Sequence, residues 1–498
     1  MNVAVIASEA VPFAKTGGLA DVAGALPPAL ERQGHRAALF LPCYQRVWKA
    51  SPPLAATGLT LRVPIGAKVV EGHVYKTTLP GSDVAVYLID QPAYFDRAGL
   101  YQVEGTDYPD NAERFIFFER AVLETIRLLD LRFDVLHCND WQTGLIPVYL
   151  RELYQGVPGL AGAATLLTIH NLAYQGAFWH WDMPLTGLDW RLFNWRQLEF
   201  HGRINFLKAG LVFADLLSTV SPTYAEEIQG PALGCGLDGL LRDRRGDLSG
   251  IVNGIDMSVW NPSVEPMLAL RYDAATVTAG KAACKAQLQR RACLPERPDV
   301  PLFAQIGRLD PQKGWDLLAE VADDLLRGDV QMVVLGEGQP RYHELLDRLA
   351  AKHVGKLRAF LEFSSPLAHQ IEAGADIFLM PSLYEPCGLN QLYSLAHGTV
   401  PLVRATGGLA DTVVDVAPES LAAGTATGFA FPEPTPRSLQ SAIDRALALW
   451  PDRDAWGRLV QAGMRSDWSW DRSAAAYCSL YEEAARRAAR RPAPALAI

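Results

Sequence analysis

The sequence is poor in the features that mark secreted, membrane-bound and disulfide-rich proteins. Its seven cysteines are odd in number and show no short paired spacing, so neither a disulfide framework nor a zinc knuckle is expected. No apolar run reaches the roughly 18 residues of a membrane span. The start, MNVAVIASEAVPF, has no basic stretch before its short apolar run, unlike a signal peptide. These absences predict a soluble protein of the reducing cytoplasm.

Positive charge and metal-ligand spacing are also lacking. The formal net charge is −9, whereas nucleic acids and anionic membranes attract basic surfaces, so we expect neither as a partner. An anionic substrate would need locally placed cations. The histidines, among them His137, His180 and His201, do not show the spacing of metal ligands. We therefore expect no metal and no other cofactor.

Short apolar runs alternate with longer helical patterns along the whole chain, which is typical of parallel α/β structure. A length of 498 residues predicts two domains rather than one. The expected strands are residues 2–9, 36–42, 84–90, 133–139, 164–170 and 216–221 in the first half, and 301–307, 330–336, 357–363, 376–382 and 400–406 in the second.

The charged, glycine-containing segment RDRRGDLSGIVNGID, at 242–256, is the best linker candidate. We expect a Rossmann-like domain over 1–245, a hinge over 246–256 and a second Rossmann-like domain over 257–475. For residues 476–498 we expect a helix that crosses back to the N-terminal domain, followed by a frayed Pro-Ala tail. The predicted fold class is α/β, with two parallel sheets facing an interdomain cleft.

Polar residues and glycines follow these strands directly, at the position where open α/β sheets bind ligands. In the first half they are Lys15, Thr16, Gly17, Gly18, Asn139, Asp140, His170 and Asn171. In the second half they are Arg308, Lys313, Gly336, Glu337, Gly338, Glu385, Gly407 and Gly408. A ligand held in a cleft between the sheets would touch both sets.

Thr-Gly-Gly-Leu-Ala-Asp occurs twice, at 16–21 and at 406–411. A Gly-Gly pair between a strand and a helix lets backbone N–H groups approach a phosphate at the positive end of the helix. The alternative is that each pair only makes a tight turn. The duplication and the neighbouring Lys15 favour the phosphate interpretation.

Two further segments carry charged residues suited to a sugar diphosphate. In GRLDPQKGWDLL, Arg308 and Lys313 can converge on a diphosphate, although a solvated surface pair is the alternative. In PSLYEPCGLNQLY, Glu385 can accept hydrogen bonds from sugar hydroxyls, or can cap the following helix. Cys387 has no evident histidine partner, so a small buried residue is expected there.

His170, in LLTIHNLAYQG, has three possible roles: general base, hydrogen-bond donor or core residue. Aromatic residues form two clusters whose rings could either stack on sugar rings or fill a core. The first cluster is Trp179, Trp181, Trp190 and Trp195, and the second is Tyr94, Phe95, Tyr101 and Tyr108.

Taken together, the motifs resemble those of bacterial glycogen synthases and plant starch synthases, which are ADP-glucose-dependent α-1,4-glucan synthases of glycosyltransferase family 5 with the two-domain GT-B fold. The matching segments are KTGGLADV, HCNDWQTGL, TIHNLAYQG, INFLKAGLVFADLLSTVSPTYAEEI, IVNGID, GRLDPQKGWDL, PSLYEPCGLNQLY and ATGGLADTV. They run in order over nearly the whole chain, and this order is highly specific.

The resemblance implies transfer of glucose from ADP-glucose to the non-reducing 4-hydroxyl of an α-1,4-glucan such as glycogen, with retention of configuration. The implied catalytic residues are His170, Arg308, Lys313, Glu385 and Asp140. The implied donor-binding residues are Lys15, Gly17, Gly18, Asp21, Asn253, Gly338, Cys387, Gly388, Leu389, Thr406, Gly407 and Gly408. Candidates for the glucan acceptor are Tyr94, Phe95 and Asn171.

By the same resemblance, Arg308 and Lys313 would neutralise the departing ADP, and Glu385 would hold glucose hydroxyls. Tyr393 stands eight residues after Glu385, where related retaining transferases carry a second Glu. No second carboxylate is placed as a covalent nucleophile, so we expect same-face transfer in which the leaving phosphate takes the acceptor's proton. The alternatives are a UDP-sugar transferase of the same fold, a sugar-nucleotide epimerase, and a glucan-binding regulator with a dead site.

Overall fold

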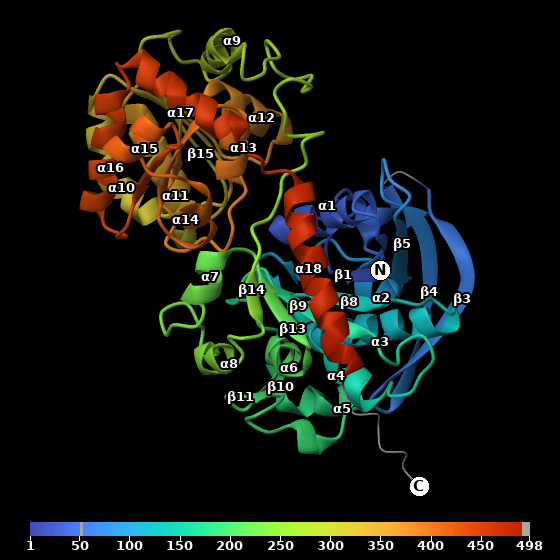
Figure 1. The fold of residues 1–498 in the computed structure, drawn as a ribbon. Helices are drawn as coiled ribbons and strands as arrows, with labels where there is room; N and C mark the ends of the chain where they lie inside the picture. Colours follow the sequence, from blue (N-terminus) through green and yellow to red (C-terminus); the bar gives the residue numbers. More distant parts are fainter. Residues whose placement is uncertain (50–52, 491–498) are drawn as a thin grey trace. The chain divides into compact units, whose positions relative to one another are not determined.

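The structure is a computed structural model that describes residues 1–49 and 53–490. The chain divides into two compact units, shown in Figure 1. The N-terminal unit comprises Met1–Gly254 and the chain from Trp470 onward, and the C-terminal unit is Ile255–Ser469. The first change of unit lies inside the predicted linker. The second comes before the predicted position 476, because a single helix begins at Trp470.

A nine-stranded sheet forms the centre of the N-terminal unit. Its order is β14 (Leu248–Gly250), β13 (Leu216–Thr219), β9 (Ala164–Ile169), β8 (Val135–Asn139), β1 (Asn2–Ile6), β2 (Arg36–Pro42), β5 (Ala85–Asp90), β4 (Lys68–Thr78) and β3 (Ala55–Ile65). From β14 to β5 every neighbouring pair is parallel. The central strands are buried on both faces, which explains their nearly continuous apolar sequence.

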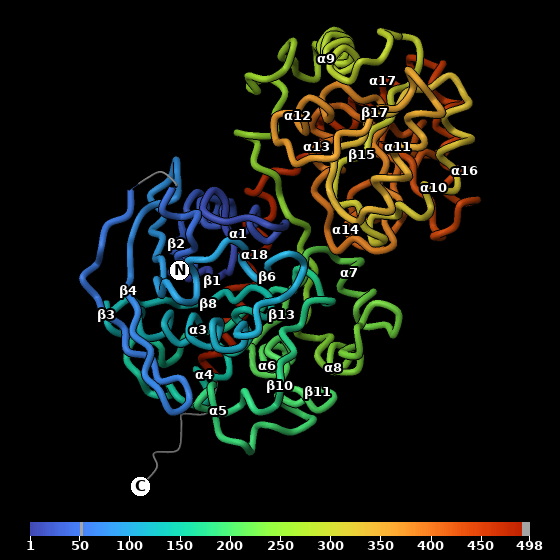
Figure 2. Tube along the Cα trace, turned by 180° about the vertical axis from the view of Figure 1, so that it is seen from behind, coloured from blue at the N-terminus to red at the C-terminus, as the bar shows by residue number. Residues whose placement is uncertain are grey.

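The antiparallel hairpin β3–β4 at one edge was not predicted. Its buried side chains alternate with exposed ones, as Leu61, Val63 and Ile65 show. Such a period-two pattern belongs to a strand with one solvated face, and it lacks the apolar run that identifies the central strands. Figure 2 shows both strands beside each other at the rim of this sheet.

Helices cover this sheet, and the last of them returns from the end of the chain. The main helices of the N-terminal unit are α1 (Gly18–Arg32), α3 (Asn111–Leu128), α4 (Ile146–Glu152), α6 (Phe206–Phe213) and α18 (Trp470–Ala489). The Tyr481 hydroxyl of α18 lies 2.8 Å from Nδ1 of His137 in β8. Ser473 donates to the carbonyl of Val252 at 2.7 Å. The predicted Pro-Ala tail, from residue 491, lies outside the described residues.

The C-terminal unit contains a six-stranded, wholly parallel sheet. Its order is β17 (Leu357–Phe360), β16 (Gln331–Leu335), β15 (Leu302–Ile306), β18 (Ile377–Met380), β19 (Val400–Arg404) and β20 (Phe429–Phe431). The helices around it include α9 (Val277–Arg291), α10 (Trp315–Arg327), α11 (Pro340–Lys352), α12 (Ser365–Gly374), α13 (Asn390–Ala396), α14 (Gly407–Thr412), α16 (Pro436–Leu449) and α17 (Arg453–Arg465).

Every predicted strand is present, and all but β2 are shorter than predicted. The C-terminal sheet is wholly parallel, and the N-terminal sheet is parallel except at the β4–β3 edge. The predicted hinge is not wholly a linker, because Leu248–Gly250 pairs with β13 as the edge strand β14. Within the described residues, no helix combines the length and the apolarity that a membrane crossing needs.

Candidate active site

Three neighbouring strands of the N-terminal unit bring its predicted site residues to one edge of the sheet. β9, β8 and β1 are adjacent and parallel. His170 follows β9, Asp140 follows β8, and the segment with Lys15 and Gly17 follows β1. Carboxyl ends of parallel strands meet at the same edge, which is where ligands bind in this class of sheet.

Glu9 organises the first Gly-Gly turn and was not identified from the sequence. Its carboxylate accepts hydrogen bonds from the backbone N–H and the hydroxyl of Thr16, from the N–H of Gly17 at 3.2 Å and from the Tyr101 hydroxyl at 2.7 Å. Glu9 is buried, with 4% of its surface exposed. A signal was available, because an acidic residue directly after a central strand obeys the same strand-end rule as its neighbours.

The phosphate interpretation expected the N–H groups of the first turn to face a ligand, but two of them are used within the protein. Those of Thr16 and Gly17 point to the protein's own carboxylate. Gly17 has an ordinary extended backbone, with φ of −149°, and a Cβ added there would meet nothing within 4 Å. The fold itself does not require glycine at this position. The open space beside it is available to a ligand.

Lys15 is exposed and pairs with Asp21 in the first turn of α1, at 2.7 Å. Burial raises the pKa of Asp21 above its ordinary value, while the ammonium of Lys15 opposes that rise. The pair holds Lys15 against the helix that begins at Gly18. An anionic ligand could exchange places with Asp21 at the ammonium, because exposed ion pairs are weak.

Asp140 holds the loop after β9. Its Oδ1 accepts the backbone N–H of His170 at 2.7 Å. Its own backbone has φ of 57°, a left-handed value that non-glycine residues seldom adopt and that is tolerated mainly by Asp and Asn. Burial raises the pKa of Asp140 to about 7, against the opposing N–H groups of His170 and Asn171. This carboxyl group therefore titrates near neutral pH.

His170 is neutral in the physiological range, since burial lowers its pKa to about 3. Nε2 lies 2.9 Å from Oδ1 of Asn139, and the amide nitrogen of Asn139 donates to the carbonyl of Ile6 at 3.1 Å. Nε2 of His170 therefore carries the proton and donates to Asn139. Nδ1 is then an acceptor, so the ring can accept a hydrogen bond from a sugar hydroxyl.

The other candidates in this unit lie in varied environments. Oδ1 of Asn253 is buried and has no hydrogen-bond partner among the described residues, as expected of a group that serves a ligand. Asn171 is partly exposed and accepts the N–H of Ala173 at 3.1 Å. Tyr94 is buried and its hydroxyl donates to Glu113. Phe95 is fully buried against Tyr44, so its ring is a core residue and offers no face to a glucan.

The tryptophan cluster is a surface feature. Trp179, Trp181, Trp190 and Trp195 are 62%, 57%, 44% and 70% exposed. Trp181 contacts Trp179 and Trp190 edge to face, at centroid distances of 6.4 Å and 5.9 Å, while Trp195 lies under the guanidinium of Arg196. The core-packing alternative is therefore wrong for these four residues, and ring stacking on a sugar stays open to them.

The C-terminal unit gathers its predicted residues at the carboxyl ends of four adjacent strands, β16, β15, β18 and β19. Arg308 and Lys313 follow β15, and Glu385 follows β18. Asp310 caps the short 3-10 turn Pro311–Lys313, because its side chain accepts the N–H of Lys313 at 3.2 Å. Gly314 then lets the chain pass the Pro381 carbonyl, which a Cβ would approach to 1.9 Å.

Lys313 and Glu385 form an ion pair, with Nζ 2.7 Å from Oε2. The Ser382 hydroxyl donates to the same oxygen at 3.0 Å. The side chain of Glu385 is 7% exposed and that of Lys313 is 23% exposed. Glu385 therefore does not cap α13, which begins at Asn390. Lys313 is equally not a solvated surface residue, because its ammonium lies against a buried carboxylate.

Arg308 is more exposed, at 55% of its side chain, and pairs with Asp310 at 3.0 Å. One of its guanidinium nitrogens also donates to Gln312 at 3.0 Å. The Arg308 side chain is thus more than half exposed, and it lies on the same loop as Lys313. An exposed cation, Arg308, and a partly buried cation, Lys313, therefore both follow β15.

The second Gly-Gly turn differs from the first, because here the fold demands glycine. A Cβ on Gly407 would lie 2.0 Å from the Glu385 carbonyl, and one on Gly408 would lie 2.1 Å from the Cys387 carbonyl. Gly407 also has φ of +46°. The turn thus packs against the loop that carries Glu385, and the N–H of Gly408 donates to the Glu385 carbonyl at 3.1 Å.

The remaining predicted donor-binding residues of the C-terminal unit also lie at the carboxyl ends of its strands. Thr406 and Cys387 are buried, Leu389 is partly buried, and Gly338 is exposed. Gly388 has φ of +73° and its Cβ position is filled by the Gln391 side chain at 2.5 Å. Gln391 in turn donates to the Cys387 carbonyl at 3.0 Å, which fixes the loop before α13.

Comparison with known proteins shows the family to which these two sets of residues belong. The model of the starch synthase catalytic domain matches residues 2–243, and that of glycosyl transferases group 1 matches residues 288–461. A glycogen synthase of Rhodopirellula baltica is 46% identical over 493 residues, covering 97% of each chain. A glycogen synthase of Anaeromyxobacter sp. is 49% identical over 486 residues, covering 97% of this chain and all (100%) of that one.

Solved structures show the same likeness. The catalytic domain of starch synthase IV from Arabidopsis thaliana, bound to ADP and acarbose, matches with a TM-score of 0.90 and 32% identity, over 97% of this chain and 99% of that chain. A sucrose-phosphate synthase from Thermosynechococcus elongatus matches with a TM-score of 0.60 at 18% identity, over 97% and 98% of the two chains, and shows the fold alone. The two parallel-sheet units are those of the GT-B fold.

Proposed function

Since the chain belongs to the glycogen synthase family of glycosyltransferases, we propose that it transfers glucose from ADP-glucose to the non-reducing 4-hydroxyl of an α-1,4-glucan, with retention of configuration. The similar proteins are named glycogen synthase, and the starch synthase IV structure is bound to ADP and acarbose. We assign the donor to the C-terminal unit and the acceptor to the N-terminal unit, and we place the enzyme in the cytoplasm.

The ion pair of Lys313 with Glu385, beside Arg308, carries this proposal. Cleavage of the bond between glucose and phosphate develops negative charge on ADP and positive charge on the sugar ring. Fixed cations aimed at the leaving group stabilise that transition state. Glu385 can accept hydrogen bonds from glucose hydroxyls while it holds Lys313 in position. Because protein cations supply the positive charge, the transfer step needs no metal in this account.

The configuration at the anomeric carbon follows from which groups are near the reacting bond. Retaining hydrolases use a second carboxylate as a nucleophile, and we assign that role to no carboxylate of this chain. Tyr393 stands where related retaining transferases carry a second Glu, and this difference concerns the group that holds the ribose. His170 is held neutral by burial, so it serves as a hydrogen-bonding partner of the sugar rather than as an acid. We therefore assign the acceptor's proton to the leaving phosphate, in a same-face transfer.

The proposal is tested by measuring nucleoside diphosphate release with and without glycogen, from ADP-glucose and in parallel from UDP-glucose. Glycogen-dependent release of ADP, with little UDP, is expected. Release mainly from UDP-glucose would overturn the donor assignment, and glycogen-independent release would overturn the acceptor. NMR should show that the newly formed linkages are all α-1,4, and intact-mass analysis during turnover should show no glycosyl-enzyme.

A further inference from the structure

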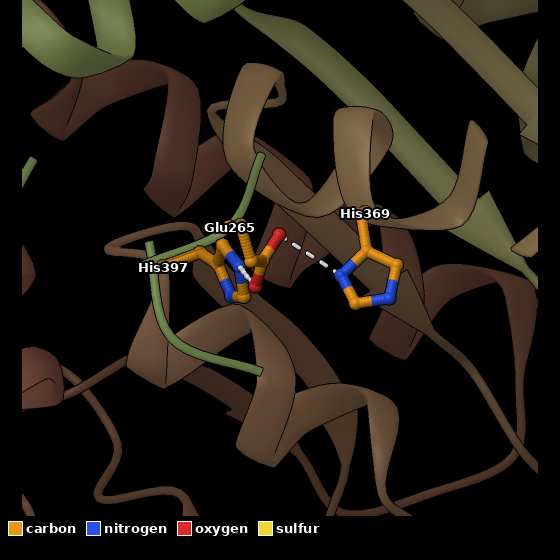
Figure 3. Close-up of side chains that lie close together, drawn as sticks. All are labelled: Glu265, His369 and His397. Carbon is orange, nitrogen blue, oxygen red and sulfur yellow. Dashed lines mark hydrogen bonds and ion pairs between the residues drawn. The ribbon is translucent and has the colours of Figure 1, made fainter. Parts of the chain in front are cut away.

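A cluster of three potential metal ligands is buried inside the C-terminal unit, outside the residues assigned to glucose transfer. It consists of Glu265 in the segment between β14 and α9, His369 in α12, and His397 directly after α13. Their side chains are 2%, 4% and 0% exposed. In Figure 3 the Glu265 carboxylate lies between the two imidazole rings, with a dashed contact to each.

The hydrogen-bonding pattern of His397 requires a cation in this cluster. Its Nδ1 lies 2.7 Å from the carbonyl oxygen of Tyr393, and because a carbonyl only accepts, Nδ1 must carry a proton. In a neutral imidazole Nε2 is then a bare lone pair. Yet Nε2 lies 2.8 Å from Oε1 of Glu265, so two acceptors would face each other. Either a proton or a metal ion has to lie at that contact.

The donor set and its support favour a metal ion. The ligand atoms of the three residues all lie within 4.8 Å of one another, so small side-chain movements bring them to a common centre. Two imidazole nitrogens and one carboxylate oxygen are a set that zinc binds in proteins, with water at the fourth position. The contact of His397 with the Tyr393 carbonyl is the outer hydrogen bond that orients a metal-binding histidine. His369 presents Nδ1 to the other carboxylate oxygen at 2.9 Å.

Within the described residues, no lysine or arginine pairs with the Glu265 carboxylate, and the Arg271 guanidinium donates to the backbone carbonyl of Glu265 instead, at 3.1 Å. The nearby ammonium of Lys281 donates to the Thr399 hydroxyl at 2.6 Å and to the Ala373 carbonyl at 3.0 Å. Glu372, one turn after His369 on α12, adds a second buried carboxylate, whose Oε1 has no hydrogen-bond partner among the described residues. Burial raises the pKa of the Glu372 carboxyl group to about 8, so Glu265 supplies the negative charge that a dication would compensate.

The cluster also has a place in the architecture. Trp260 stacks on His369 with a centroid distance of 3.9 Å and on Tyr393 with one of 3.7 Å. Glu265 therefore fastens the irregular segment after Ile255 to α12 and to the end of α13. Because α13 follows the loop of Glu385 and Cys387, a bound ion would brace that loop from behind without touching substrate.

We propose that Glu265, His369 and His397 bind one structural dication of the zinc class. The full-length protein, freed of any histidine tag, is purified and its metal content measured by mass spectrometry. About one zinc per chain is expected. EDTA-treated protein should melt at a lower temperature, and added ZnCl₂ should restore the melting temperature. A metal content at background, with a melting temperature that zinc does not move, would overturn the proposal and leave a proton between His397 and Glu265.

Variants locate the ion. His397→Gln and Glu265→Gln should lose both the bound zinc and the zinc-dependent rise in melting temperature. His353→Gln is the matched control, because His353 pairs with Asp323 outside the cluster, and it should keep both. Equal zinc in all variants would overturn the assignment. Should the cluster variants fail to fold, cobalt added to the EDTA-treated native protein gives a second readout: visible absorption of a low-symmetry site is expected, and only the spectrum of hydrated cobalt would overturn the proposal.

Discussion

The ammonium of Lys313 lies 2.7 Å from Oε2 of Glu385, although the two residues come from loops after different strands, β15 and β18. Lys313 is placed by the turn that Asp310 caps, and Glu385 by the second Gly-Gly turn packed against its carbonyl. The pair thus links a cation suited to a leaving diphosphate with a carboxylate suited to sugar hydroxyls. Each residue orients the other before substrate arrives.

Glu385→Gln should lower turnover by about 100-fold, because it keeps the size of the side chain but removes the charge that positions Lys313. The melting temperature should change little, since Lys313 is partly exposed and can be rehydrated. Steady-state kinetics with ADP-glucose and glycogen test this. Ser382→Ala is the control, because it removes one hydrogen bond to Glu385 and leaves the charge. Native turnover in Glu385→Gln would show that the carboxylate is only structural.

The two Gly-Gly turns should respond oppositely to alanine. Gly17→Ala should leave the melting temperature nearly unchanged, because its Cβ would enter open space, but it should weaken donor binding if a ligand uses that space. Gly407→Ala should destabilise the C-terminal unit, since its Cβ would meet the Glu385 carbonyl at 2.0 Å and its φ is positive. Melting curves and the KM for ADP-glucose separate the two. A Gly17→Ala enzyme with native kinetics would remove the first turn from the site.

Glu9→Gln should destabilise the Lys15–Gly17 loop. The amide group cannot accept at both oxygen positions, so at least one of the charge-assisted hydrogen bonds from Thr16, Gly17 or Tyr101 is lost, at a cost of about 1.5–3 kcal/mol. The free energy of unfolding, measured by urea titration, and the turnover should both be lower than in the native protein. Ser8→Ala, which removes only a contact to Tyr101, should be far milder. Equal effects of the two substitutions would contradict an organising role for Glu9.

Asp140 should make folding stability depend on pH. Its pKa in the folded protein is raised to about 7 from an ordinary value of 3.8, so the ionised form is disfavoured by folding. The stability associated with the protonated form is therefore lost progressively as pH rises from about 4 to about 7. Asp140→Asn lacks this loss and tolerates the same backbone. The melting temperature of Asp140→Asn minus that of the native protein should increase from pH 5 to pH 7.5 and then stay constant. A constant difference would contradict the raised pKa.

The parallel core was readable from the sequence because its strands are buried on both faces. Val3 to Ile6 and Phe303 to Ile306 are near-continuous apolar runs with polar residues at their ends. The hairpin β3–β4 was missed because its burial alternates, and β20 was missed because three residues are too few to stand out. The position of α18 rests on contacts, such as Tyr481 with His137, that span 344 residues.

Site residues such as Lys313 and Glu385 could be predicted from the sequence, because a charged residue at the end of a strand was a sufficient signal. Roles that depend on several distant partners were not. Glu9 acquires its role from a loop that folds back onto it, and Glu265 meets His397 across 132 residues of sequence. The two copies of one hexapeptide were also indistinguishable in sequence, although one glycine pair is fixed by close backbone contacts and Gly17 is not.

We propose that Lys313 stabilises the departing nucleotide, and the decisive variant is Lys313→Ala. Turnover from ADP-glucose and the dissociation constant for glycogen are measured on the same preparation, with Lys352→Ala, an exposed lysine paired with Asp323, as the control. Turnover of Lys313→Ala should fall by about 10²–10³, while its glycogen affinity stays within about twofold and the control is unchanged. If Lys313→Ala instead keeps its turnover but loses glycogen affinity, Lys313 does not act on the leaving nucleotide.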